Sequence, residues 1–581
     1  MANLSQQRRE KMLAFLETLK EQHSDDDSLI AIGEIEKELK AKKYGLVWEE
    51  HEEAVDVQMK TQIPVFTEIK EKEICADENG AYNFLLEGDN LHSLYLLEKT
   101  HKGKIDVIYI DPPYNTQNKD FVYDDNLIGF DDGFRHSKWL SFMAERLTVA
   151  KKLLSDKGCI FISIDDNEVA QLKLMCDEIF GESAFVTQLV WEKKKKGSFL
   201  SNQITNIKEY VLVYCKNKTM FSGLIGEINS KTETYPCINA SNKRAICKIS
   251  KGIKSNYKEK NYIVPAGTTI SDSTMDIKYI TDLIIEDGIV KEDFEVEGNW
   301  RYSSEAMHNY SVNNELYITN ALYIRRIVSE PRKKMMKDLL PRVGEDDTLS
   351  YNTPIEADNL FNSGWGSNED ADNELIAFFG KQRKFSYPKP VRLIQKLICA
   401  TRLTDAIILD FFAGSGTTGQ AVMELNKQDG GHRKFILCTN NENGICEEVT
   451  YQRLRTVITG KRADGSEYSE GIPANLKYFK TDFVDKESED LSDELLEHIA
   501  EMIELEYGIK IDSQKYVMIM TDEEMDEFER NIASYAELKA VFVNQDILLS
   551  ATQQKLLDSL TSYVIPDYYF DFELREAGEL W

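Results

Sequence analysis

The segment Asp111-Pro112-Pro113-Tyr114 places a carboxylate, two rigid residues and an aromatic ring in four consecutive positions. It follows directly on the apolar run 105–110, which the pattern predicts to be a buried β-strand. In open α/β sheets, ligands bind in the crevice beyond the carboxyl ends of the strands. The Asp111 carboxylate and the Pro112 carbonyl can accept hydrogen bonds from an amine, and the Tyr114 ring can stack on a planar base. These four residues, called the tetrad below, therefore predict a site for an exocyclic amino group.

A second motif has the form of a strand, a glycine-rich turn and a helix. The apolar run 406–410 leads into the turn 411–419, and the stretch 420–425 continues as a predicted helix. This geometry lets the backbone approach a nucleotide-like cofactor closely, because glycine has no side chain in the way. The motif therefore predicts a cofactor site at the end of a second strand.

The glycine spacing leaves two cofactors open. Gly414, Gly416 and Gly419 match the pattern G-x-G-x-x-G, which would suit a nicotinamide-dependent dehydrogenase. That interpretation leaves the segment 111–114 without a role. The arrangement Phe-x-Gly-x-Gly that begins at Phe412 instead favours S-adenosylmethionine, whose methionine end has no pyrophosphate that needs a helix N-terminus.

The order of the motifs carries further information, because Asp111 precedes Gly414 by 303 residues. This order, with a long insert between the halves, resembles the β-class of DNA amino-methyltransferases. The resemblance implies a circularly permuted Rossmann-like α/β sheet, an inserted target-recognition domain and S-adenosyl-L-methionine as cofactor. It also implies methylation of N6 of adenine in duplex DNA, because the tetrad of N4-cytosine enzymes usually begins with serine.

Three more segments resemble elements of this family. Residues 84–90 look like its strand that ends in Gly-Asp, residues 385–390 resemble its Pro-Lys-Pro element, and residues 434–442 look like its ribose-binding strand. Residues 438–441 depart from the family's usual residues. The resemblance implies that the cofactor is bound by Asp89, Lys389, Pro390, Asp410, Phe412, Gly414, Gly416, Thr417 and Glu442.

Some details resemble the modification subunit of type III restriction–modification systems, namely 115–116, 139–154, 164–168 and 209–214. This resemblance implies a homodimer on double-stranded DNA, joined by a helicase–nuclease restriction subunit. The alternative is a stand-alone amino-methyltransferase of the N4-cytosine type without a nuclease partner.

Two further rivals are weaker. A C5-cytosine methyltransferase needs a Pro-Cys nucleophile, and Pro236-Cys237 occurs, but it lies in the insert with no catalytic strand ahead of it. A non-catalytic DNA-binding or assembly subunit would tolerate loss of the tetrad, which is intact. Transfer to an amino nitrogen needs no covalent enzyme intermediate and no metal, but the target base must be flipped out of the duplex.

Composition favours a multidomain globular protein. Of 581 residues, 42% are hydrophobic, and no apolar run approaches the roughly 20 residues that span a bilayer. The polar N-terminus lacks the apolar core of a signal peptide, so we expect a cytoplasmic protein. No two of the nine cysteines have Cys-x-x-Cys spacing and the histidines are scattered, which predicts reduced, mostly buried thiols and no metal site.

The net charge of −30 is distributed unevenly. Residues 481–581 hold 7 Lys+Arg against 26 Asp+Glu, whereas residues 191–260 hold 15 against 5. Local potential, rather than the total charge, attracts a phosphate backbone. We therefore expect the basic insert to bind DNA through Lys193, Lys194, Lys195, Lys196, Lys243, Arg244, Arg325 and Arg326.

The chain divides into five expected parts. Residues 1–70 read as helices, and residues 71–190 and 371–485 as the catalytic and cofactor-binding halves of the methyltransferase domain. Residues 191–370 form the expected target-recognition domain. Residues 486–581 form a small acidic α/β domain, with strands at 515–520 and 538–543 and the helix 522–533 between them.

Overall fold

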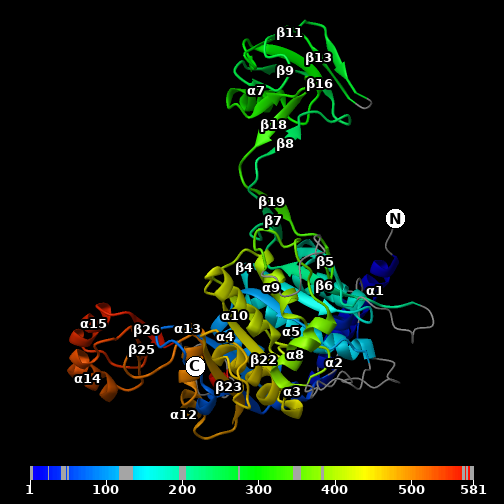
Figure 1. Cartoon of the computed structure of the whole chain (residues 1–581). Coiled ribbons are helices and arrows are strands. Elements are labelled where there is room, and N and C mark those ends of the chain that lie inside the picture. Colours follow the sequence, from blue (N-terminus) through cyan, green and yellow to red (C-terminus); the bar gives the residue numbers. More distant parts are fainter. Residues whose placement is uncertain are drawn as a thin grey trace. The chain divides into compact units, whose positions relative to one another are not determined.

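The computed structural model describes residues 4–23, 25–40, 48, 52–116, 135–194, 204–272, 275–343, 355–380, 385–565, 569–570 and 573–575 (Figure 1). The chain forms two compact units. The first contains Met1–Leu224, Lys337–Ile355 and Phe361–Trp581, and the second contains Ile225–Met336 and Glu356–Leu360. No helix within the described ranges is both long and apolar enough to cross a membrane.

A large mixed sheet organises the first unit. Its strands lie in the order β1 (Gln62–Glu68), β23 (Asn475–Asp485), β2 (Tyr82–Glu87), β22 (Lys434–Thr439), β21 (Ile407–Asp410), β3 (Ile105–Ile110), β4 (Leu154–Ile164), β6 (Lys208–Cys215), β5 (Phe185–Glu192) and β20 (Leu339–Leu340). The strands from β23 to β4 run parallel to one another, and β6 enters antiparallel between β4 and β5.

The centre of this sheet joins the two halves of the chain. β21 pairs with β3, with Ile408 opposite Val107 and Leu409 opposite Ile108. The strand that leads into residues 111–114 therefore lies beside the strand that leads into the glycine turn, although about 300 residues separate them in sequence. The predicted circularly permuted α/β sheet is confirmed.

Helices cover both faces of the sheet. The helices α4 (Asn90–His101), α5 (Arg135–Leu153) and α6 (Val169–Phe180) pack in succession, as do α9 (Val391–Ala400), α10 (Thr417–Asp429) and α11 (Gln452–Thr459). The crossovers through α4 and α5 progress in the opposite direction from the crossover through α10. Right-handed connections therefore place the two groups on opposite faces.

The N-terminal region differs in one respect from the expected all-helical segment. It contains α1 (Leu4–Gln22), α2 (Asp26–Lys40) and α3 (Ala54–Met59), but residues 62–68 form the strand β1. The run Ile63 to Phe66 is buried and pairs with β23. Pro64 lacks a backbone N–H, which is tolerated because β1 is an edge strand. The short apolar run therefore forms an edge strand of the sheet instead of part of a helix.

The second unit is rich in β-structure. One of its sheets contains β11 (Tyr262–Val264), β14 (Leu283–Glu286), β15 (Ile289–Val290), β10 (Lys254–Ser255), β17 (Leu316–Ile318), β18 (Ile324–Val328) and β8 (Glu233–Pro236). Another contains β12 (Thr269–Ser271), β13 (Asp276–Tyr279), β16 (Phe294–Asn299) and β9 (Arg244–Ile249), and a third pairs β19 (Arg332–Met335) with β7 (Ile225–Asn229). The helix α7 (Ser304–Val312) packs on β9.

The C-terminal segment confirms the predicted small α/β fold. The strands β24 (Tyr516–Ile519), β25 (Ala540–Asn544) and β26 (Ser562–Ile565) are parallel, with α14 (Asp522–Asn531) and α15 (Ala551–Asp558) as crossovers. A capping box between Thr521 and Glu524 begins α14. The preceding helices α12 (Leu491–Leu496) and α13 (Ile499–Tyr507) belong to the core of the main sheet, because Leu491, Ile499 and Met502 are buried there.

Candidate active site

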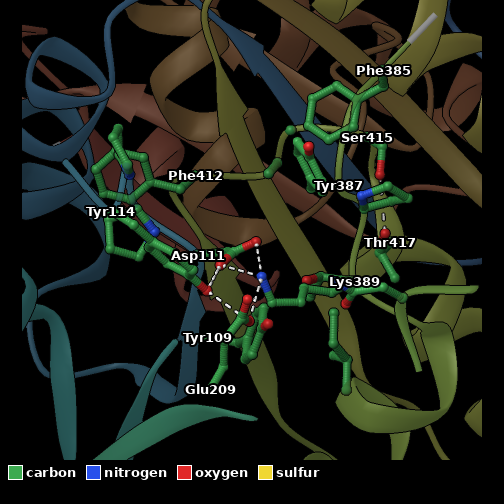
Figure 2. A pocket seen from close by; sticks show the side chains of 18 of the residues that line it. Tyr109, Asp111, Tyr114, Glu209, Phe385, Tyr387, Lys389, Phe412, Ser415 and Thr417 are labelled. Atoms are coloured by element: carbon green, nitrogen blue, oxygen red, sulfur yellow. Dashed lines mark hydrogen bonds and ion pairs between the residues drawn. The ribbon is translucent and has the colours of Figure 1, made fainter. Parts of the chain in front are cut away.

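The two motifs meet at one cavity of about 350 Å³ beyond the carboxyl ends of β3 and β21. The tetrad follows β3 and the glycine turn follows β21, so the neighbouring strands place both at the same sheet edge. Figure 2 shows side chains from both halves around the cavity. Of the residues that the sequence predicts, the lining includes Asp111, Pro112, Pro113, Tyr114, Lys193, Lys194, Lys389, Asp410, Phe412, Gly414 and Thr417.

The Asp111 carboxylate is paired with Lys389 from the other half of the chain. The Lys389 Nζ lies 2.8 Å from Oδ1 and 2.8 Å from Oδ2. The Tyr114 hydroxyl donates to Asp111 Oδ1 at 2.6 Å, and the Lys389 ammonium lies 4.9 Å from the centre of the Tyr114 ring. Together these contacts orient both the carboxylate and the ring, and Figure 2 draws the hydrogen bonds and ion pairs among them.

A second buried carboxylate, Glu209 of β6, adjoins this pair. Its Oε1 accepts a hydrogen bond from Lys193 at 2.8 Å, and its Oε2 lies 3.4 Å from Lys389 Nζ and 3.3 Å from the Tyr114 hydroxyl. Opposite charges are thus interleaved at the base of the cavity. A buried ion cluster of this kind is stable only when each charge has a partner.

The pKa values follow from burial and from this pairing. Burial alone would lower the pKa of Lys389, but the carboxylates of Asp111 and Glu209 outweigh it and raise the pKa above its usual value. Burial would raise the pKa of Glu209, but Lys389 and Lys193 outweigh it and lower the pKa. Burial and the nearby carboxylates raise the pKa of Tyr114 well above its usual value. Lys389 is therefore charged and Tyr114 keeps its proton.

The glycine turn is fixed by Asp410. Its carboxylate accepts hydrogen bonds from the Phe412 N–H at 3.0 Å and from the Thr418 hydroxyl at 2.5 Å. Burial raises the pKa of Asp410 to about 7. Gly414 has a φ of 47°, and a side chain there would lie 3.0 Å from the Phe385 ring. The turn therefore needs glycine and leaves its backbone open to a ligand.

Arg453 of α11 donates hydrogen bonds to residues of the same turn. It is fully buried and donates to the Thr417 hydroxyl at 2.8 Å and to the Ser415 hydroxyl at 3.1 Å. Its other amino group lies 3.4 Å from Glu374. Thr450, in the π-helical turn Ile445–Tyr451, donates to the Gly414 carbonyl at 2.5 Å. These long-range contacts determine the conformation of the turn.

A second set of contacts fixes the end of the tetrad and the residue that follows it. The Trp139 indole donates to the Pro113 carbonyl at 2.7 Å, and Asn115 donates to the buried Glu168 carboxylate at 2.6 Å. Asn115 has a φ of 58°, and Tyr387, on the other side of the cavity, has a φ of 55°. Left-handed backbone at non-glycine residues is costly and often marks functional sites.

Four residues predicted to bind the cofactor lie outside the cavity lining, namely Asp89, Pro390, Gly416 and Glu442. Asp89 caps α4 and lies 3.3 Å from the buried Arg146. Pro390 is the N-cap of α9, and Gly416, with a φ of 77°, is the N-cap of α10. Glu442 is exposed, in the turn that follows β22.

The residues predicted to bind DNA fall into different settings. Lys193 and Lys194 line the cavity, while Lys195 and Lys196 lie outside the described residues. Lys243 of the second unit is exposed to solvent.

The three arginines predicted to bind DNA all have partners within the second unit. Arg244 pairs with Asp276 at 2.7 Å, and Arg325 donates to the Thr234 carbonyl at 2.7 Å. Arg326 pairs with Glu315 at 3.0 Å and lies over the Tyr310 ring. These partners satisfy part of the hydrogen-bonding capacity of each guanidinium.

The Pro236-Cys237 pair is not placed as a nucleophile would be. Cys237 lies in the hydrophobic core of the second unit, and burial raises the pKa of its thiol to about 12. A buried, protonated thiol is unreactive.

All nine cysteines are free and eight are buried, as predicted. Within the described ranges, no cluster of three or more His, Cys, Asp or Glu side chains could hold a metal ion.

Among the site residues that escaped the sequence prediction are the two charged residues Glu209 and Arg453. Glu209 stands first in the segment 209–214 noted above, and its charge just ahead of an apolar strand was the available signal. Arg453 had no such signal, because its role depends on contacts with residues 33 to 38 positions away.

Comparison with known proteins agrees with this site. A protein-family model described as DNA methylase, for N6 and N4 methyltransferases, matches residues 105–451, which include both motifs. The type III restriction-modification enzyme StyLTI Mod subunit of Salmonella typhimurium is 34% identical over 65% of this chain and 56% of its own length. The EcoPI Mod subunit of Escherichia phage P1 is 32% identical over 63% of this chain and 58% of its own length.

A shorter relative is matched along more of its length. The type II methyltransferase M.KpnI of Klebsiella pneumoniae is 33% identical over 63% of this chain and 82% of its own length. In contrast, this chain spans little more than half the length of the two Mod subunits. With a family model over more than half of its residues and both motifs in one cavity, the chain belongs to the N6/N4 DNA methylase family.

Proposed function

We propose that this chain is an S-adenosylmethionine-dependent DNA methyltransferase that methylates N6 of adenine, as the modification subunit of a type III-like system. The observation that carries the proposal is the single cavity between the Asp111–Tyr114 tetrad and the Phe412–Thr417 turn. One side of the cavity offers acceptors for an amine and the other an open glycine backbone. The two sites are adjacent, as direct transfer between two bound reactants requires.

The residues present fit the proposed cofactor. Gly414 keeps the backbone open where a Cβ would meet Phe385, and the Phe412 ring and the Thr417 hydroxyl line the same cavity. These residues would hold S-adenosylmethionine, which when bound supplies a methyl group on a positively charged sulfur. Asp89, Pro390, Gly416 and Glu442 remain proposed as contributors, since the first and last are polar residues near strand ends.

Asp111 and Tyr114 would position the target base. Asp111 accepts a hydrogen bond from the exocyclic amine, as does the Pro112 carbonyl, so that the nitrogen lone pair points toward the methyl group. Tyr114 stacks on the flipped base and offsets part of the cost of unpairing, which is a few kcal/mol. The proton released from the amine after transfer passes to the Asp111 carboxylate or to water.

Support for adenine comes from Asp111 at the first tetrad position and from relatives named as Mod subunits. The Mod relatives also support a restriction partner. In this proposal the second unit, which contains Lys243, serves target recognition, and Lys194 of the first unit and Lys243 contact phosphates. A stand-alone amino-methyltransferase of the N4-cytosine type without a nuclease partner is the second candidate. Its stand-alone character is supported by the type II methyltransferase M.KpnI, which is matched over 82% of its length.

The test is incubation of the purified protein with duplex DNA and methyl-labelled S-adenosylmethionine, followed by nucleoside mass spectrometry and methylation-sensitive sequencing. We expect N6-methyladenine within one sequence motif. N4-methylcytosine would favour the second candidate. Detection of 5-methylcytosine, or of a covalent adduct at Cys237, would contradict both.

A further inference from the structure

Glu209 stands out because it is a buried carboxylate that the reaction described above does not use. Only 6% of the residue is exposed. It comes from β6, a different strand from the tetrad, and it contacts three groups of the cavity: Lys193, Lys389 and Tyr114. Burying a carboxylate is costly unless it is paired, and the partners of Glu209 are groups of the tetrad and its lysine.

The hydrogen bonds at Asp111 show which acceptor is left for a substrate. A carboxylate oxygen can accept about two hydrogen bonds. Oδ1 already accepts from Tyr114 at 2.6 Å and from Lys389 at 2.8 Å. Oδ2 accepts only from Lys389, at 2.8 Å, in the part of the chain that the structure describes. On the Asp111 carboxylate, an amine entering the cavity therefore finds one open acceptor direction, at Oδ2.

Both donors that occupy Asp111 are also contacted by Glu209. Its Oε2 is 3.4 Å from Lys389 Nζ and 3.3 Å from the Tyr114 hydroxyl. A lysine ammonium has three N–H donors, which match the two Asp111 oxygens and the one Glu209 oxygen. The Lys193 contact at 2.8 Å holds Glu209 itself in place.

We propose that Glu209 is a positioning residue for the methyl transfer: it holds Lys389 as an ammonium against Asp111, so that Asp111 Oδ2 is the acceptor presented to the target amine. The proposal rests on the proposed function and adds to it the acceptor atom and a residue that acts through Lys389.

Charge supports the same assignment. The carboxylates that raise the pKa of Lys389, against the effect of burial, are those of Asp111 and Glu209. Among the described residues, the other titratable groups that line the cavity are Tyr109, Tyr114, Asp165, Lys193, Lys194, Tyr387 and Asp410. Removing the charge of Glu209 therefore leaves Lys389 with a single close carboxylate, and its pKa falls.

The test is Glu209→Gln, which keeps the size of the side chain and removes its charge. Because misplacing a reacting group by about 1 Å can cost about 100-fold in rate, we expect kcat to fall by about 10- to 100-fold. We expect KM for S-adenosylmethionine to change by less than about twofold. The alkaline limb of the kcat–pH profile should shift to lower pH, because Lys389 loses its proton more readily.

Tyr210→Phe is the matched control. Tyr210 is the next residue on β6, and its hydroxyl donates to Asp166 at 3.0 Å, outside the cavity lining. We expect its kcat and pH profile to equal those of the wild type. A merely structural role of this strand would lower activity in both variants without moving the alkaline limb, and that result would overturn the proposal.

Glu209→Asp keeps the test decisive if Glu209→Gln does not fold. It retains the charge but shortens the reach, so we expect a lower kcat with the alkaline limb near its wild-type position. A wild-type kcat in Glu209→Gln, or a shifted limb in Glu209→Asp, would contradict the proposal. Wild-type protein is assayed first, and a wild type that transfers no methyl group would refute the proposed function itself.

Discussion

The Asp111 carboxylate and the Lys389 ammonium, 278 residues apart in the chain, lie 2.8 Å from each other through both carboxylate oxygens. The pair joins the half of the domain that carries the tetrad to the half that carries the glycine turn. Because β3 and β21 are neighbours, a single lysine ahead of α9 can reach the end of β3. The proposed reaction centre is therefore shared between the two halves of the permuted domain.

Tetrad substitutions should separate catalysis from cofactor binding. We expect Asp111→Ala to reduce methyl transfer by at least about 100-fold, because the amine loses the acceptor that orients it. Tyr114→Ala should lower the rate and weaken binding of the flipped base.

Calorimetric titration with S-adenosylmethionine is the accompanying measurement. We expect both variants to bind the cofactor, since Phe412 and Gly414 lie in the other half of the chain. Loss of cofactor binding in Tyr114→Ala would show that the two sides of the cavity are not separable.

Duplexes with a mismatch at the target base should bind to the protein more tightly than fully paired duplexes, because the target base is already unpaired.

Asp410 should make stability depend on pH. Burial raises the pKa of its carboxyl to about 7 in the folded protein, above its usual value of 3.8. The folded state therefore binds more protons than the unfolded state between these values, and this contribution to stability is lost as pH rises toward 7. Asp410→Asn cannot titrate, so the melting temperature of the wild type relative to this variant should fall between about pH 5 and 7. A constant difference across that range would contradict the raised pKa.

Arg453 should act on cofactor affinity through the glycine turn. Arg453→Met removes the donors to Ser415 and Thr417 and leaves Glu374 without this partner. Loss of a buried charged hydrogen bond costs about 1.5–3 kcal/mol, so we expect the Kd for S-adenosylmethionine to rise by about 10- to 100-fold. Arg455→Met is the control, because Arg455 lies in the same helix but is exposed. Equal effects of the two substitutions would exclude a specific role.

The basic insert should contribute sequence-independent affinity for DNA. The double variant Lys194→Gln, Lys243→Gln should bind all duplexes more weakly. The slope of log K against log salt should decrease by about one for each phosphate that the variant no longer neutralises. Lys291→Gln serves as control, because Lys291 is already paired with Glu286 at 3.0 Å. An unchanged slope would mean that these lysines are only solvated. Lys193 is left intact, since it pairs with Glu209 in the cavity.

Local patterns in the sequence were enough to locate both motifs. The short, nearly continuous apolar runs that precede Asp111 and Phe411 predict buried strands, because a pattern of this kind extends over only a few residues. Glycine at 414 and the prolines at 112 and 113 restrict the backbone wherever they occur. The capping box at Thr521 and Glu524 likewise needs no distant partner. The fold class and the position of the tetrad and the glycine turn at strand ends were therefore determined by the sequence alone.

Tertiary structure decided which charges meet. β6 enters antiparallel beside β4, and this pairing carries Glu209 to the base of the cavity, where it contacts Lys193, Lys389 and Tyr114. Arg453 reaches the glycine turn only after α11 packs against α10. Ion pairs between distant residues depend on distances that no local pattern encodes, because the chain can bring a given lysine to many carboxylates. The sequence determined where the chemistry lies, and the packing of the sheet determined how its charged groups are held.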